Sequence, residues 1–526
     1  MAYPKRLFLG LGLSIANGWP NNQGVTKIPY FTDIIYGEDE WSYGVVTPDG
    51  SKAQYSLLAG NYNAVVDGNA DYYVKVEWSG VTGKFSCKLA DTFVVSTGTL
   101  SNSSGYVERV MSVGSGTTLW IQDAVGGTTG GTITVSCKKV TYPSSFYAPM
   151  VYNDYASLNS KFESDYSVNK PYMTSTNAND ADEYAWHCVY WLQFYIEMHR
   201  LSGDVKWYTY MTNLISRMFD YTDEARQARG EIDTSTQLYT QAPTQYMFTN
   251  VGVAAPAWRR NLTSYEVIVL ITGQICRGIM KAVDYILVKN NHPASVSLAN
   301  SYIPKIRTAL NIHDDTWRYD RQGNGSIPGS FHYQNPNIPN GTYSNPVANN
   351  HNFVWATAAL LTNKWSTPIV EYTNRSQAIL DFIRLYWIEK PDNNALVWRY
   401  AYDVANPNSK IEDINHGHLD LSFFLTVYKR KFLNMTEDEY NKIANNVVYW
   451  YIADQNAAVK IDGTDGVAIQ AHQIEIALEY PDLSDKRNDI RRIARGILNK
   501  HLTSPSFSIP YAALATIIRV DSLGAS

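Results

Sequence analysis

The period of the hydrophobic pattern changes once along this chain, and this change constrains the fold more than any other feature. From about Trp41 to Tyr142 the pattern has a period of two, which is typical of half-buried β-strands. After a proline-punctuated segment that ends near Lys170, apolar residues recur at helical spacing. The sequence therefore predicts a multidomain protein in which a β module precedes an all-α domain.

The first part of the chain contains short strand-like segments separated by turns. The clearest are residues 71–78, 84–89, 118–122 and 132–137. Short strands at this spacing are typical of antiparallel sandwiches, so we expect a jelly-roll-like β-sandwich over residues 41–145. Residues 1–40 begin with an apolar run that imitates a signal peptide, but we expect this segment to be retained as an attachment arm.

The second part, residues 146–526, has a helical period throughout. The helix-like segments are 181–202, 204–221, 263–289, 294–311, 352–363, 367–388, 416–433, 436–453, 467–479, 485–500 and a shorter one after Pro510. Thr436 and Glu439 form a capping-box pattern. Short turns alternate with long loops, such as 223–262 and 312–350, and long structured loops are usually functional. This alternation predicts a ring of antiparallel helix pairs whose long loops surround one cleft.

Composition excludes several classes of function. The net charge of −5 is too small to indicate nucleic-acid or membrane-surface binding, and no apolar stretch reaches the ~18 residues of a membrane span. The chain has 39 Tyr and 14 Trp, which suit either core packing or carbohydrate binding. No phosphate-binding loop or nucleophile motif occurs, so we expect no cofactor. The four cysteines match no metal motif and are expected to be buried thiols, with a Cys87–Cys137 bridge as a second possibility.

Residues 397–430 concentrate the chemically useful side chains. An aromatic run is followed by two acids, an Asn-His-Gly-His cluster and a helix pattern. If Asn415 caps that helix, His416 and Asp420 share one face. The candidate catalytic residues here are Tyr400, Tyr402, Glu412, Asp413, His416 and Asp420, and the candidates for substrate binding are Trp398, Arg399 and His418. The plainer alternative is that Asp413 and Asn415 only cap a helix and that His416 and Asp420 form a structural hydrogen bond.

Other segments offer further candidates. Asn350 and His351 end a long loop before a helix, where a capping role is equally expected; we assign Asn350 to substrate binding and His351 to catalysis. Trp317, Trp186 and His187 are candidates for lining the substrate. The 313–319 segment has no zinc-like spacing, and residues 462–466 lack the ligand set of a calcium loop, so we expect no metal.

Two resemblances give these patterns a context. The order of strands ending in residues 132–140 resembles small carbohydrate-binding-module-like sandwiches found on phage tail proteins and secreted glycan-active enzymes. The helical part resembles the (α/α) toroid of polysaccharide lyases, glycoside hydrolases and uronate epimerases, with similar parts at 347–356, 412–420 and 462–466. These resemblances imply a phage tail-associated depolymerase that acts on a bacterial polysaccharide. They assign no catalytic role to an individual residue.

Two routes of glycan cleavage make different demands. β-Elimination on a uronic acid needs a base, here His416 or His351, a proton donor, here Tyr400 or Tyr402, and groups such as Arg399 and Asn350 that hold the carboxylate. Hydrolysis needs two carboxyl groups, for which Glu412, Asp413 and Asp420 are nearest. The richness in His, Asn, Tyr and Arg favours elimination. A glycan-binding or structural tail protein without catalysis is the alternative of a different class.

The resemblances also imply a location and partners. We expect a virion protein, with an extracellular enzyme as the alternative. Residues 1–40 would bind other tail proteins, and a homo-oligomer is expected as a further possibility.

Overall fold

The computed structural model describes residues 35–46, 70–89, 92–96, 100–113, 119–123, 132–142, 144–166, 183–231, 245–246, 254–259, 267–319, 328–334, 343–401 and 411–524. Most of the expected arm and the candidate Tyr402 lie outside these residues.

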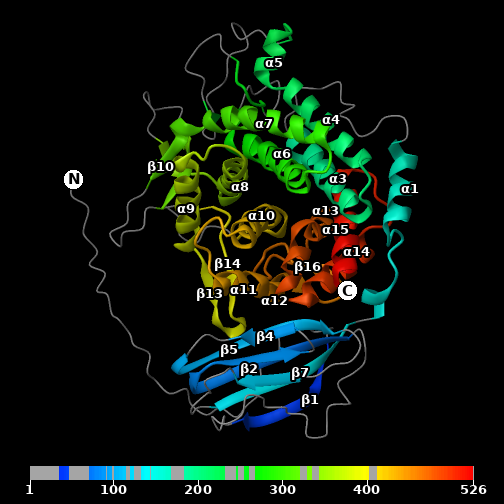
Figure 1. Ribbon diagram of the computed structural model, residues 1–526, viewed down its shortest axis with the longest axis vertical. Coiled ribbons are helices and arrows are strands. Elements are labelled where there is room, and N and C mark those ends of the chain that lie inside the picture. Colours follow the sequence, from blue (N-terminus) through cyan, green and yellow to red (C-terminus); the bar gives the residue numbers. More distant parts are fainter. Residues whose placement is uncertain are drawn as a thin grey trace, which may run out of the picture.

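Seven strands form two antiparallel sheets at the bottom of Figure 1. The strands are β1 (Ile35–Val46), β2 (Ala70–Gly83), β3 (Phe85–Leu89), β4 (Thr92–Ser96), β5 (Leu100–Val113), β6 (Leu119–Asp123) and β7 (Thr132–Thr141). One sheet has the order β1-β7-β2-β5 and the other β4-β3-β6. The antiparallel β module is therefore present, and the four expected strand segments correspond to β2, β3, β6 and β7. Its closure into a jelly-roll-like sandwich stays a prediction.

Six helices form the inner wall of a ring in the larger, mostly helical part of the chain. They are α3 (Val189–Ser202), α6 (Val269–Lys289), α8 (Asn349–Trp365), α10 (Ile414–Arg430), α13 (Gln470–Glu479) and α15 (Ser508–Gly524). Each packs against the next, and α15 packs against α3 (Figure 1). We call these six helices the inner ring.

A second layer of helices covers the inner ring. It comprises α1 (Tyr155–Tyr166), α4 (Lys206–Asp220), α7 (Pro293–Asn311), α9 (Val370–Arg384), α11 (Glu437–Asn445) and α14 (Asn488–His501). The sequence missed α1, which follows the 3-10 turn η2 (Ser144–Tyr147) in the expected linker, and the short helix α5 (Asp223–Ala228). The expected segment 436–453 is divided in the structure into α11 and the short helix α12 (Val447–Trp450). The other helices of both layers correspond to the expected segments, with ends shifted by several residues.

Helices α6, α8 and α10 of the inner ring run in the same direction, as contacts at both ends show. At the N-terminal end, the backbone N–H of Asn349 in α8 donates to the carbonyl of Tyr400, ahead of α10 (2.8 Å). At the C-terminal end, the Asp284 carboxylate of α6 accepts from Lys364 of α8 (2.5 Å) and pairs with Arg430 of α10. Since short turns lead from the inner to the outer helices, the long connections lie at the N-terminal end.

The long connections contain short antiparallel strands that the sequence pattern did not reveal. They are β8 (Gln245–Tyr246) with β9 (Val267–Ile268), β10 (Trp317–Tyr319) with β11 (Gly329–Gln334) and β12 (Tyr343–Pro346), β13 (Ile388–Lys390) with β14 (Ala395–Val397), and β15 (Tyr451–Ile452) with β16 (Asn456–Ala457). Strands of two to six residues are too short for a periodic pattern to be recognised.

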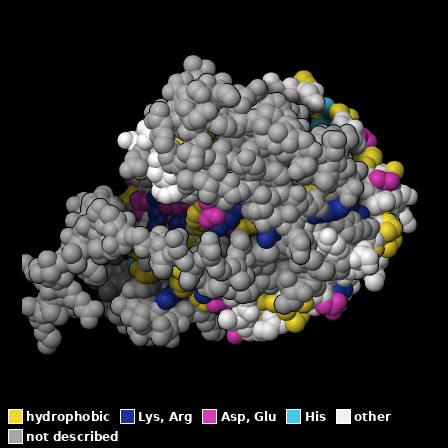
Figure 2. All heavy atoms as spheres, turned by 90° about the horizontal axis from the view of Figure 1, so that it is seen from below, with side chains coloured by type: hydrophobic (Ala, Val, Ile, Leu, Met, Phe, Trp, Pro, Cys, Tyr) yellow, Lys and Arg dark blue, Asp and Glu magenta, His cyan; other side chains and the backbone are white. Residues whose placement is uncertain are grey.

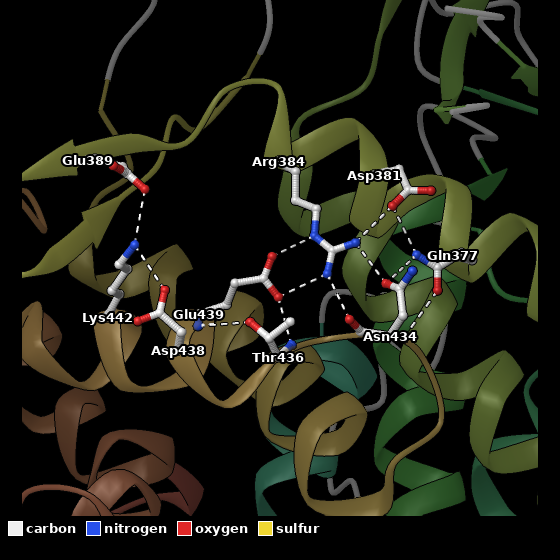
Figure 3. Close-up of polar contacts among 9 residues, drawn as sticks. All are labelled: Gln377, Asp381, Arg384, Glu389, Asn434, Thr436, Asp438, Glu439 and Lys442. Atoms are coloured by element: carbon white, nitrogen blue, oxygen red, sulfur yellow. Dashed lines mark hydrogen bonds and ion pairs between the residues drawn. The ribbon is translucent and has the colours of Figure 1, made fainter. Parts of the chain in front are cut away.

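The second layer is held together by side-chain networks such as the one around Arg384 (Figure 3). Its guanidinium donates two hydrogen bonds to Glu439 of α11 (2.8 and 2.9 Å) and others to Asp381 and Asn434. Glu439 also completes the capping box with Thr436, which confirms that prediction. A bidentate arginine pair of this kind fixes the geometry as well as the charge.

The β module rests against the outer layer through charged side chains. Arg492 of α14 pairs with the buried Asp71 of β2, and Arg109 of β5 lies 3.6 Å from Glu437 of α11. Figure 2 shows the molecule from the side of the β module, where acidic and basic side chains of the described residues are intermixed.

Two other predictions concern burial and membranes. Cys188 and Cys276 are buried thiols, as expected, whereas the Cys137 side chain lies outside the described residues and its pairing with Cys87 stays a prediction. Within the described residues, no helix combines the length and apolar character that a membrane crossing requires.

Candidate active site

Asp413 and His416 form the centre of the candidate site, at the N-terminus of α10. Asp413 is the N-cap: its Oδ1 accepts the backbone N–H of His416 (2.8 Å), and its Oδ2 accepts a hydrogen bond from the imidazole Nδ1 (2.9 Å). The expectation that Asn415 caps this helix is wrong, because the helix already begins at Ile414. One carboxylate thus both starts the helix and orients the imidazole.

The pair leaves His416 accessible and its charge stabilised. Its side chain is 31% exposed, its Nε2 has no hydrogen-bond partner among the described residues, and the ring of Tyr400 lies 5.0 Å away. Burial lowers the pKa of His416, but the hydrogen bond and charge of Asp413 outweigh it, so the pKa is raised. Burial likewise opposes ionisation of Asp413, yet the bonds and charge of His416 lower its pKa.

Behind this pair, Glu412 and Asp420 are completely buried and hydrogen-bonded to each other. Glu412 Oε1 accepts the backbone N–H of Asp413 (3.0 Å), and Asp420 Oδ2 accepts the indole N–H of Trp398 (2.7 Å). Burial, followed by the charge of Asp420, raises the pKa of Glu412, and burial raises the pKa of Asp420. The alternative expectation of a hydrogen bond between His416 and Asp420 is therefore wrong, because Asp420 contacts Glu412 and Trp398 instead. Glu412 and Asp420 share a proton.

A hairpin that follows β16 lies against the start of α10. The backbone N–H of Ile414 donates to Val459 and that of Ile461 to Glu412 (both 3.0 Å), and Lys460 Nζ lies 3.9 Å from Asp413 Oδ2. The segment 462–466, which resembles a calcium loop, forms the turn of this hairpin. The sequence pattern therefore marked a turn that supports the site.

The same side chains present a possible set of metal ligands. One ligand atom each from Glu412, Asp413 and His416 lies within 4.8 Å of the others. Two of these groups already bond to each other, and the ammonium of Lys460 stands beside the carboxylate of Asp413. A cation there would meet a positive charge, so we assign acid–base chemistry and no metal to this cluster.

Helix α13 adds residues that the sequence reasoning missed. His472 Nε2 lies 3.2 Å from Asn415 Nδ2, which places the start of α13 beside the start of α10. Glu475 is buried one turn further on, and the hydroxyl of Tyr480 lies close to Gly417. The available signal was the spacing of His472 and Glu475, which puts both on one face of the helix.

The start of α8 joins this site through Asn349, whose Nδ2 donates to the carbonyl of Arg399 (2.6 Å). Asn350 is completely buried, and neither polar atom of its side chain has a hydrogen-bond partner among the described residues. His351 is also buried in the first turn of α8. The two polar segments therefore adjoin, although no described contact joins His351 to His416.

Other candidates lie apart from this cluster or only support it. Trp398 is buried and binds Asp420, and His418 is buried with its Nε2 2.7 Å from the hydroxyl of Tyr190. Trp317 is buried against Phe331, which makes it a core residue rather than a surface for a sugar. Trp186 and His187, in the π-helical turn η3 (Tyr184–Cys188) before α3, have no described contact with the start of α10.

Comparisons with known proteins give little further information. No protein family and no curated protein matches the chain. Similar solved structures include a GH76 α-mannanase from Bacteroides thetaiotaomicron, with 14% identity and a TM-score of 0.39 over 71% of this chain and 96% of that one. A sialidase (9% identity, TM-score 0.28, 76% and 50%) and a rhamnosidase from Klebsiella oxytoca (9%, 0.16, 75% and 96%) are also similar. All three TM-scores lie below 0.5, and no conclusion about this chain rests on them.

Proposed function

We propose that this protein cleaves a polysaccharide by proton transfer at the Asp413–His416 pair. The observation that carries the proposal is the state of the His416 side chain. Asp413 accepts a hydrogen bond from its Nδ1, whereas its Nε2 has no partner among the described residues, and the side chain is partly exposed. An imidazole oriented in this way by a carboxylate can accept and return a proton. A glycan fits because the amide of Asn415, the ring of Tyr400 and the ammonium of Lys460 lie near the pair.

We favour β-elimination on a uronic-acid-containing polymer. His416 would take the proton from C5, the bond from C4 to the leaving oxygen would break, and a C4–C5 double bond would form. Asn350, buried without a partner, and Arg399 would hold the substrate carboxylate, and Tyr400 beside His416 is one source of the proton for the leaving oxygen. These residues are our candidates for the roles that elimination requires.

Glycoside hydrolysis is the second candidate, because two acids near the site have opposite pKa shifts. The pKa of Asp413 is lowered, whereas that of Glu475 is raised, which is the division expected between a base and an acid. Glu412 and Asp420 do not suit these roles, because they bond to each other and a glycosidic bond needs carboxyl groups ~5 Å or more apart.

A glycan-binding protein without catalysis fits the site less well. Binding alone does not require a buried pair of acids that shares a proton, or an imidazole that is oriented by a carboxylate. The bacterial origin of the glycan, the virion location, attachment through residues 1–40 and a homo-oligomer are proposals that rest on the resemblances given above.

The test is to incubate the protein with a panel of bacterial capsular polysaccharides and exopolysaccharides. Ultraviolet absorbance from unsaturated uronate is followed together with new reducing ends. A rise in both supports elimination, and reducing ends without absorbance support hydrolysis. Binding without either signal would overturn the enzymatic proposal in favour of the binding protein. His416→Ala should abolish cleavage, whereas the surface variant Glu371→Gln on α9 should keep it.

A further inference from the structure

We propose that Glu475 is a further catalytic residue, a carboxylic acid that donates its proton to the oxygen that leaves when the glycosidic bond breaks. This inference rests on the proposed function, because it gives Glu475 a role in the same reaction. It applies to both routes, since elimination and hydrolysis each require a proton on the leaving oxygen.

The first observation is that Glu475 is buried without a partner. The residue is 8% exposed, and its side chain forms no hydrogen bond or ion pair with any described residue. A buried carboxylate in a structural role is normally paired, because an isolated charge is costly to bury. Glu479, one turn later on the same face of α13, shows the paired arrangement, with Lys281 at 2.5 Å and Arg277 at 3.4 Å.

The second observation is the position of Glu475 between the site and that paired acid. His472, one turn earlier on α13, contacts Asn415, the residue next to His416. On the side of α3, Glu475 acts electrostatically on Tyr190, whose hydroxyl lies 2.7 Å from His418 Nε2. Glu475 therefore lies in the middle of α13, one turn further into the ring than the end at which the Asp413–His416 pair is located.

The charges around Glu475 keep its proton in place. The nearby cations of α6, Arg277 and Lys281, are bound by Glu479, and Arg519 of α15 is bound by Glu197 and Asp482. The charge that acts on Glu475 is the carboxylate of Asp413, and burial together with this charge raises its pKa to about 8. The neighbouring His418 of α10 is buried, and its pKa is lowered by burial and then by Arg277, so it adds no compensating charge.

The proton balance is complete with the residues present. When the bond to the leaving oxygen breaks, its electron pair stays on that oxygen, which takes the proton from Glu475. Glu475 becomes a carboxylate while His416 has gained a proton from the sugar in elimination, or Asp413 has gained one from water in hydrolysis. Transfer of that proton to Glu475 through solvent restores both groups for the next turnover.

The first experiment measures kcat and KM of Glu475→Gln on the polysaccharide that the unaltered protein cleaves. Glutamine has the size of glutamate but has no carboxyl proton to donate, so kcat should fall ~10²–10⁴-fold with KM changed little. The alkaline decline of kcat near pH 8 in the unaltered protein should disappear. Glu479→Gln is the matched control on the same helix face; it should lower Tm but keep the alkaline decline.

A second measurement does not depend on activity. Infrared difference spectra taken while the pH is raised through about 8 should show the loss of one protonated carboxyl band in addition to those of the Glu412–Asp420 pair, and Glu475→Gln should lack this additional change. A Glu475 already ionised at neutral pH, or a Glu475→Gln variant with unchanged kcat and pH profile, would overturn the inference alone. Absence of cleavage by the unaltered protein would instead overturn the proposed function and this role with it.

Discussion

The carboxyl groups of Glu412 and Asp420 are in direct contact inside the inner ring, and Trp398 forms a hydrogen bond with each of the two residues. The backbone carbonyl of Trp398 accepts the N–H of Glu412 (3.0 Å), and its indole donates to Asp420 (2.7 Å). Two ionised carboxylates in contact would repel each other strongly in this buried setting, so the pair retains a proton. The protonated pair in turn fixes Asp413, whose backbone N–H is bound by Glu412.

The first prediction concerns stability and pH. The pKa of Asp420 in the folded protein is raised to about 7, and that of Glu412 is raised as well, so their contribution is present at acid pH and is lost as the pH rises through neutrality. Asp420→Asn can still accept from Trp398 and can donate to an ionised Glu412. The variant should therefore lose less stability than the unaltered protein on going to alkaline pH.

Urea unfolding midpoints across the pH range measure this effect. Glu371→Gln, on the exposed surface of α9, serves as the control and should leave the slope of stability against pH unchanged. Parallel curves for Asp420→Asn and the unaltered protein would contradict a shared proton at this pair.

The second prediction separates the capping role of Asp413 from its role beside His416. Asparagine is as good an N-cap as aspartate, so Asp413→Asn should change the free energy of unfolding by less than ~1 kcal/mol. It removes the charge that raises the pKa of His416, and kcat should fall by ~10²-fold or more. Nuclear magnetic resonance titration of the imidazole should show a lower pKa. If the pKa of His416 and the kcat are unchanged in Asp413→Asn, the role of Asp413 is limited to capping α10.

Much of the helical architecture was predictable from the sequence because long amphipathic segments carry a strong periodic signal. The segment 294–311, for example, corresponds to α7, which the structure begins at Pro293, and the Thr436 capping box was recognised from two residue types at fixed spacing. The short strands of the long connections, such as β10 with three residues, were missed because so few residues cannot show a repeated alternation.

The cluster of the candidate site was predictable only where its members are close in sequence. Glu412, Asp413 and His416 share one helix start, so their proximity follows from local geometry. Which groups bond could not be predicted, because Asp420 turns to Trp398 rather than to His416. The contribution of α13 depends on which inner helices are neighbours, and that relation is set by ring closure rather than by local pattern.

The third prediction concerns Asp284, which joins three inner helices at the end of the ring opposite the site. It is 2% exposed and accepts from Lys364 and Trp365 of α8, and it also pairs with Arg430 of α10. Asp284→Ala removes the shared partner of two partly exposed cations and should cost ~1.5–3 kcal/mol. At a temperature where the variant stays folded, kcat should be unchanged.

Thermal unfolding and activity of the same preparation test this separation of stability from chemistry. Asp438→Asn, which breaks the exposed pair with Lys442, is the control and should cost less than ~1 kcal/mol. A Tm for Asp284→Ala as high as that of the control would show that the three-helix contact is dispensable. A large loss of kcat in the folded variant would place Asp284 in the catalytic machinery instead.

The fourth prediction concerns the close approach of Tyr480 to Gly417, the residue after His416. A Cβ on residue 417 would lie 2.8 Å from the Tyr480 hydroxyl and 3.4 Å from Ile461 Cγ2. Gly417→Ala must therefore displace either Tyr480 or the first turn of α10. Overpacking of this kind costs ~1–3 kcal/mol, and the displacement should reduce kcat because the imidazole belongs to that turn.

A double-mutant cycle with Tyr480→Phe tests this contact. Removal of the hydroxyl makes room for the added methyl group, so Gly417→Ala with Tyr480→Phe should be more stable than the sum of the single effects predicts, by ~0.5–3 kcal/mol. The double variant should also recover part of kcat, because the turn that carries His416 returns to its place. Additive effects on both quantities would mean that the methyl group is accommodated elsewhere and that Tyr480 does not set the position of His416.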